Sequence, residues 1–342
     1  MALAVTPEQL EGRMRLSKTL RQQLENEATQ TEETGFPTTI WQTIQSFIPN
    51  INHRYTIYNN PIVLFEIDMH DLWYKLMLAG KVTDANDVAQ DRLVSMILYA
   101  RELGTLSRTT TVGDGEPSEE AVTEEGTRIW TDLPYCVRDF RDEWLKSMDL
   151  SVKRRANLAA LTARMAAVGI GGNDLTANAL WLFREMLEIP RRLTRVDLGD
   201  EVPVEELLPA CFPWLRLCGP KLVKLSFNNH TFPNLDPQLT EPGELARKAN
   251  IKDPGFSIDR WVFWRQRLKE LGRCEHAQLA EGARGLYKNM IRQGLEAGVK
   301  IPGEAEYEKR VHAFMQQKIE KFGFGERNMV TSEGFSIYSD ED

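Results

Sequence analysis

The chain has 342 residues, of which 42% are hydrophobic and 27% are charged, a composition typical of folded proteins and unlike that of disordered chains. Acidic residues outnumber basic residues by 50 to 42 without any long basic stripe, which argues against a nucleic-acid partner. No apolar stretch approaches the roughly 20 residues of a membrane-spanning helix, and the N-terminus lacks the pattern of a signal peptide, so a cytoplasmic protein is expected. The four cysteines form no C-x-x-C pair, so reduced thiols are expected.

Residues 1–60 are expected to form an N-terminal helical arm. Thr6, Pro7 and Gln9 make up a helix start with a capping residue, a proline in the first turn and a capping-box glutamine. The predicted helix ends in the polar run 26–34.

Residues 61–322 are expected to form one helical domain, followed by a C-terminal tail over 323–342. Apolar residues recur at helical spacing after Pro61, and Gly80 is predicted to end that helix. Further helices are predicted from cap, period and stop signals over about 84–103, around Phe140, and over 151–168, 174–189, 257–272, 276–297 and 304–322. Between them, a polar loop is expected over 105–126, broken or kinked helices over 204–225 because of three prolines, and a long loop over 226–256.

No segment shows the alternating pattern of a β-hairpin. The predicted fold class is therefore all-α, an irregular multi-helix bundle or array with a single main domain.

Motifs of known cofactor sites are absent. There is no Walker A loop, no G-x-G-x-x-G and no G-x-S-x-G, and no histidine stands in a metal-ligand motif, so neither a cofactor nor a metal is expected. The acidic run 139–143 resembles the first carboxylate patch of class I terpene cyclases, but the second patch lacks two of its three expected donors at Ala177 and Trp181. Glu66 and His70, four residues apart, leave a weaker metal-dependent alternative.

Tryptophan is abundant, with eight residues in the chain, and arginines accompany several of them. Indoles that line a cavity, with arginines as hydrogen-bond donors to a ligand, predict a site for a lipophilic small molecule. The competing interpretation is that the indoles pack the core and the arginines lie on the surface. The predicted catalytic residues are Arg138 and Arg141, and the predicted substrate-binding residues are Trp130, Trp144, Trp181, Arg184, Trp261 and Trp264.

Four segments carry a family resemblance. They read IWTDLP at 129–134, NLAAL at 157–161, ALWLFREMLE at 179–188 and RWVFWR at 260–265, with Phe140 and Trp144 after the first. From about 84 to 297 the chain resembles a fungal family of cytosolic helical proteins known only as a domain of unknown function. The resemblance implies no reaction. By analogy, some helical proteins without cofactor motifs act as cyclases or pericyclases in fungal secondary metabolism, including one that closes the norbornene of a sordaricin-type diterpene.

The resulting hypothesis is a cofactor-independent cyclase or isomerase, similar to Diels–Alderases, that folds a terpenoid or polyketide into a reactive conformation. The alternative is a noncatalytic helical protein that binds a ligand or a protein partner and regulates it. The oligomeric state stays open at this level.

Overall fold

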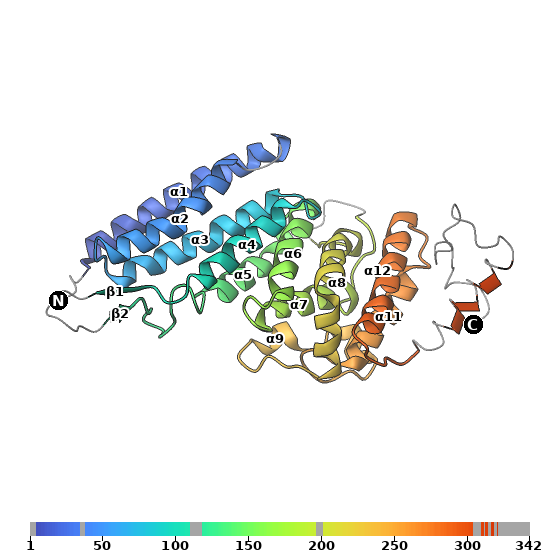
Figure 1. Ribbon diagram of the computed structural model, residues 1–342. Coiled ribbons are helices and arrows are strands. Elements are labelled where there is room, and N and C mark those ends of the chain that lie inside the picture. Colours follow the sequence, from blue (N-terminus) through green and yellow to red (C-terminus); the bar gives the residue numbers. More distant parts are fainter. Residues whose placement is uncertain are drawn as a thin grey trace.

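The computed structural model describes residues 5–34, 38–109, 118–195 and 201–303, together with a few positions between 309 and 320. These residues are predominantly helical and form an elongated array, with α1 and α2 at one end and α11 and α12 at the other (Figure 1), so the all-α prediction is confirmed. The longer helices are α1 (Pro7–Thr34), α2 (Thr38–Thr56), α3 (Ile62–Val82), α4 (Ala89–Glu102), α5 (Cys136–Leu145), α6 (Val152–Ala167), α7 (Ala177–Leu187), α8 (Val204–Phe227), α11 (Ile258–Leu271) and α12 (Ala277–Glu296).

Shorter elements connect these helices. They are the strands β1 (Ser107–Thr109) and β2 (Ser118–Glu120), the 3-10 turns η1 (Ser147–Asp149) and η2 (Asp174–Thr176), and the helices α9 (Pro237–Thr240) and α10 (Glu244–Lys248). Among the described residues no helix is long and apolar enough to cross a membrane. Most of the helix expected over 304–322, and the whole tail 323–342, lie outside the described residues.

The first helices differ from the prediction in extent. The polar run 26–34 continues α1 to Thr34 instead of ending it. A second helix, α2, follows where no separate helix was expected. Its buried residues are Ile40, Ile44, Ile48, Ile51 and Tyr55, which recur at helical spacing and place one apolar face on α3.

Helix α3 is the contact point between the two halves of the array, because it packs on α1, α2 and α5 and also on α6. The predicted stop at Gly80 is wrong, since α3 continues to Val82. A β-carbon at Gly80 would lie 2.5 Å from Cδ2 of Leu161 on α6. Glycine is needed there for close approach of two helices, and not for a helix end.

Helix α8 corrects the expectation of broken or kinked helices over 204–225. Pro209, Pro213 and Pro220 all lie inside one continuous helix of 24 residues. Each proline removes a backbone hydrogen bond, but α8 is packed between α6, α7, α11 and α12, and this burial offsets the loss. Gly282 and Gly285 on α12 face Leu208 and Phe212 of α8 and let the two helices approach closely.

A small antiparallel sheet lies within the predicted loop 105–126. Strands β1 and β2 pair with Arg108 opposite Glu119, and the guanidinium Nε of Arg108 donates to the Glu119 carboxylate at 2.9 Å. The three-residue strands are too short for an alternating pattern to be detected in the sequence.

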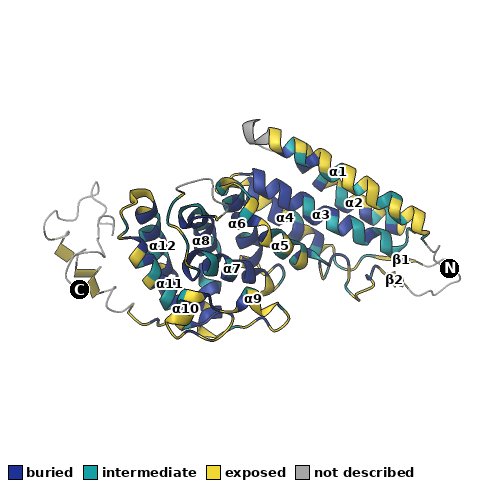
Figure 2. Ribbon diagram, turned by 180° about the vertical axis from the view of Figure 1, so that it is seen from behind, coloured by how far each residue is buried: buried dark blue, intermediate teal, exposed yellow. Residues whose placement is uncertain are grey.

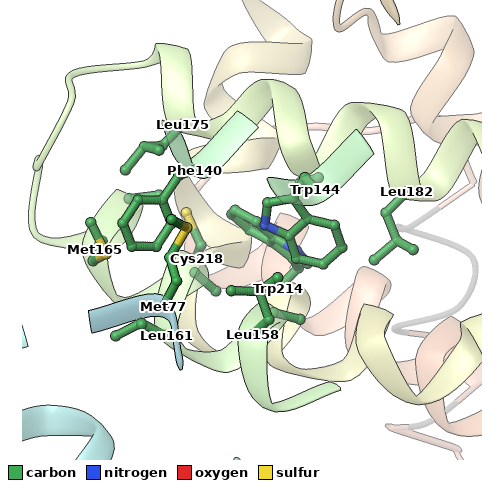
Figure 3. Packing of buried hydrophobic residues seen from close by; sticks show 14 of the residues in the cluster. Met77, Phe140, Trp144, Leu158, Leu161, Met165, Leu175, Leu182, Trp214 and Cys218 are labelled. Carbon is green, nitrogen blue, oxygen red and sulfur yellow. The ribbon is translucent and has the colours of Figure 1, made fainter. Parts of the chain in front are cut away.

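The core runs through the whole array, and exposed residues are confined mainly to the outer helix faces and the loops (Figure 2). Near its centre, the rings of Trp144 and Trp214 lie 6.5 Å apart, surrounded by aliphatic and sulfur-containing side chains (Figure 3). The four cysteines are free thiols, and all but Cys274 are buried.

Candidate functional site

A groove with a volume of about 830 Å³ lies between α1, α3 and α5. This volume falls within the range of about 300–1,000 Å³ that is typical of small-molecule sites. Helix α1 forms one wall, α3 the floor and α5 the other wall. The groove is lined chiefly by Met14, Arg15, Lys18 and Arg21 on α1, by Ile67, His70, Tyr74 and Met77 on α3, and by Asp139, Asp142, Glu143 and Lys146 at α5.

A histidine–aspartate pair joins the floor of this groove to one wall. Nδ1 of His70 lies 2.7 Å from Oδ2 of Asp139, and the side chains are 34% and 14% exposed. Because a carboxylate only accepts hydrogen bonds, Nδ1 is the donor, which leaves Nε2 as the basic nitrogen of the neutral ring. Nε2 has no hydrogen-bond partner among the described residues. The pair therefore has the arrangement of an oriented general base.

Tyr135 holds the imidazole from the other side. Its ring stacks on His70 with centroids 4.4 Å apart and an interplanar angle of 18°. The Arg138 guanidinium lies 4.6 Å from the centre of the same tyrosine ring. Burial raises the pKa of Tyr135 to about 12, and the Glu66 carboxylate acts in the same direction, so the phenol stays neutral at physiological pH.

The backbone before α5 explains how Tyr135 reaches this position. Tyr135 has φ 65° and Leu133 has φ 51°, a left-handed conformation that is uncommon outside glycine. Pro134 lies between these two residues, and the Trp73 indole on α3 donates to its carbonyl at 2.7 Å, which anchors the segment to α3. Such strained residues persist where surrounding contacts hold them, and they cluster at functional sites.

Ion pairs hold α1 over the groove. Asp68 of α3, fully buried, accepts from Arg13 of α1 and from Arg54 of α2. Asp71 accepts from the Ser17 hydroxyl at 2.6 Å and from Arg21 Nε at 2.7 Å. In the N-terminal half of α1 no apolar side chain is buried, so this wall of the groove is attached mainly by polar contacts.

Three predicted site residues meet on the far side of α5. Arg141, Trp144 and Trp181 line a recess with room for about one water molecule, of about 10 Å³. The Trp144 indole is buried and donates to the Thr162 hydroxyl at 3.1 Å. Arg141, Trp144 and Trp181 thus surround a small recess and not the large groove.

Three further predicted residues lie around the buried Glu188. The Trp264 indole donates to Glu188 Oε1 at 2.6 Å, and Trp261 packs beside Trp264 with ring centroids 6.2 Å apart. Arg184 donates from Nε to the Glu241 carbonyl at 3.1 Å. Trp261 and Trp264 are both completely buried in the core.

The other two predicted residues are separate from these groups. Trp130 is buried and donates from its indole to the Asn52 side chain on α2 at 2.7 Å. Arg138 is partly exposed, donates to the Glu125 carboxylate at 3.2 Å and reaches the groove only through Tyr135.

The His70–Asp139 pair is not visible in the sequence, because the two residues are 69 positions apart and belong to no motif. Glu66 and His70 both lie on α3, but the two side chains have different partners. Glu66 accepts from the Glu124 amide at 3.1 Å. In the described part of the chain no group of three or more potential ligands is placed to hold a metal ion.

Comparison with known proteins identifies the family of the chain. A family model described as "Protein of unknown function (DUF3632)" matches residues 73–268, more than half of the chain. The chain belongs to this family. The region that matches the family model contains Tyr135, Asp139 and Glu188. It begins within α3, after His70, so α1 and α2 precede it. The resemblance inferred from the four sequence segments is thus confirmed.

One similar protein is "Oxopyrrolidines biosynthesis cluster protein G" of Penicillium oxalicum (strain 114-2 / CGMCC 5302). It is 28% identical to this DUF3632 protein over 244 residues, which is 68% of this chain. The match spans 66% of the length of that relative, just under two thirds. No solved structure matches the chain.

Proposed function

We propose that this DUF3632 protein acts in fungal secondary metabolism as a cofactor-independent isomerase or cyclase, and that the reaction takes place in the α1–α3–α5 groove. The observation that carries the proposal is the His70–Asp139 pair, with Nδ1 and Oδ2 at 2.7 Å, inside a groove of small-molecule size. The relative named for a fungal biosynthesis cluster supports the metabolic setting.

In the proposed reaction His70 transfers a proton. Nε2 accepts a proton from a carbon next to a carbonyl group, and the electron pair of that C–H bond moves into the enolate. The imidazolium then returns the proton to a different atom of the same substrate, so substrate and product have the same composition. Asp139 keeps the ring oriented and stabilises the imidazolium. If ring closure is pericyclic, the groove contributes by holding the folded conformer.

The arginines and tryptophans predicted from the sequence lie around the groove or away from it, and their roles in this proposal differ. Arg138 lies over the Tyr135 ring, which stacks on His70, and so supports the His70–Asp139 pair indirectly. Arg141 lines the separate recess beside Trp144 and Trp181, so in this proposal it does not contact a substrate in the groove. Trp130, Arg184, Trp261 and Trp264 contribute to the scaffold that carries α5 and α7, through the contacts described above.

The experiment that tests the function is gene deletion followed by complementation in the organism that carries the gene. Wild-type protein and His276→Gln, an exposed control histidine, are expected to restore the product. His70→Gln is expected to accumulate a precursor with the same mass as the product, because an isomerase changes no atoms. Full restoration by His70→Gln would overturn the proposal, and loss of product without any isomer would favour the noncatalytic alternative.

A further inference from the structure

The charged residues of the groove are not all available to a ligand. Most already have partners in the protein: Arg15 with Glu11, Arg21 with Asp71, Glu25 with Tyr74, Asp139 with His70, and Glu143 with Lys81. Within the described residues, the side chains of Lys18, Asp142 and Lys146 have no hydrogen bond or ion pair. The groove thus offers two ammonium groups and one carboxylate that have no partner in the described part of the protein.

The two ammonium groups come from different helices. Lys18 lies on α1, and Lys146 follows the last residue of α5 on the opposite wall. The lining also includes apolar side chains, Met14 on α1 and Ile67 and Met77 on α3. A ligand that fills the groove therefore meets both apolar surface and two cationic groups, an arrangement suited to an amphipathic molecule with a negatively charged end.

From this arrangement we infer that the ligand of the groove is an amphipathic anion, whose carboxylate or enolate oxygen is bound by Lys18 and Lys146 while its apolar body covers Met14, Ile67 and Met77. The inference rests on the proposed function for the choice of the groove as the ligand site. It also agrees with the chemistry proposed for His70, because proton removal next to a carbonyl creates negative charge on an oxygen, which a nearby ammonium group stabilises.

Asp142 provides a test of the inference, because its substitution should change the affinity for an anion in the opposite direction to substitution of a lysine. Its free carboxylate repels an anion in the same groove, so neutralising it and neutralising a lysine have opposite effects on affinity. Lys18→Gln and Lys146→Gln are each expected to weaken anion binding about fivefold, the effect of a partly exposed ion pair. Asp142→Asn is expected to tighten binding by a similar factor. A general loss of structure would weaken binding in all three variants.

The experiment is calorimetric titration of the full chain with three probes of equal chain length: decanoate, decanol and decyltrimethylammonium, each below its critical micelle concentration. Decanoate is expected to bind most tightly, and added salt is expected to weaken its binding but not that of decanol. The matched control Lys252→Gln, exposed and outside the groove, should leave all three affinities unchanged.

The outcomes separate this inference from the proposed function. Equal binding of decanol or of the cationic probe, or decanoate binding that ignores the three groove variants, would overturn the ligand class and leave the groove as a reaction site. Absence of binding by all three probes would overturn the groove itself and with it the proposed function. To distinguish a carboxylate from an enolate, the titration is repeated with a 2-decyl-1,3-dicarbonyl compound above its pKa.

Discussion

Glu188 and Arg260 form a two-point ion pair in the interior, and neither side chain is exposed to solvent. Nε of Arg260 donates to Oε1 at 2.6 Å and Nη2 donates to Oε2 at 3.0 Å. The remaining Arg260 N–H groups bind the carbonyls of Thr240, Gly255 and Glu241, so one side chain organises the long segment before α11. This pair joins two of the segments that carry the family resemblance.

Glu188→Gln is expected to lower the free energy of unfolding by about 3–5 kcal/mol, because it leaves a buried guanidinium without its counter-charge. Chemical denaturation monitored by circular dichroism measures the change. Glu244→Gln, which removes a carboxylate from an exposed pair with Lys248, is the matched control and should have little effect. Comparable losses in both variants would contradict the central role of the buried pair.

Gly243→Ala is expected to destabilise the protein by about 1–3 kcal/mol, the range for overpacking. A β-carbon at this position would lie 2.7 Å from both the Cβ and the carbonyl oxygen of Glu188. Backbone atoms cannot move away as easily as the end of a flexible side chain, so the clash is not readily relieved. Gly12→Ala, at a site on α1 with nothing within 4 Å, should instead stabilise the helix by about 0.5–1 kcal/mol. Thermal unfolding of the two variants is expected to show shifts of opposite sign.

Lys75 predicts a pH dependence of stability. Burial lowers its pKa from 10.5 to about 8, against the opposing effect of the Asp71 and Asp68 carboxylates. The unfolded chain therefore binds more protons than the folded chain between these pH values, and stability rises with pH in that window. From pH 7.5 to 9.5 the wild-type protein is expected to gain about 2 kcal/mol relative to Lys75→Met. Parallel pH profiles of the two proteins would show that Lys75 does not titrate in this way.

Asp139→Asn is expected to lower kcat by about 100-fold or more, with KM changed little, once the substrate is identified. An amide at this position can donate to Nδ1 and so favour the wrong tautomer of His70, although the geometry is conserved. Asp253→Asn, an exposed residue outside the groove, is the control and should retain full turnover. A change confined to KM would assign Asp139 to binding instead of proton transfer.

Arg138→Ala is expected to lower kcat several-fold, because the guanidinium supports the Tyr135 ring that stacks on His70. Arg138→Lys retains the charge above the ring and should recover part of the loss. Arg141→Ala reports on the separate recess beside Trp144. If Arg141→Ala lowers turnover and Arg138→Ala does not, the reaction belongs at the recess and not in the groove.

The local signals in the sequence were reliable where cap, period and stop agree. Ser151 caps α6 by accepting from the Arg154 amide at 3.3 Å, and Ser257 caps α11 by accepting from the Arg260 amide at 3.1 Å, at the starts of the helices predicted over 151–168 and 257–272. Gly169, with φ 82°, follows the end of α6, next to the last residue of the helix predicted over 151–168. The buried isoleucines of α2 recur with an equally clear helical period.

The sequence by itself determined the all-α class, most helix positions and the family, because these depend on short-range periodicity, caps and residue identity. Only the tertiary structure decided what the individual side chains do. The pairing of His70 with Asp139 and of Glu188 with Arg260 joins residues 69 and 72 positions apart, and no local pattern encodes such a distance. The same applies to the indoles: a tryptophan has the same apolar surface in a core as in a cavity wall, so packing alone placed Trp264 beside Glu188.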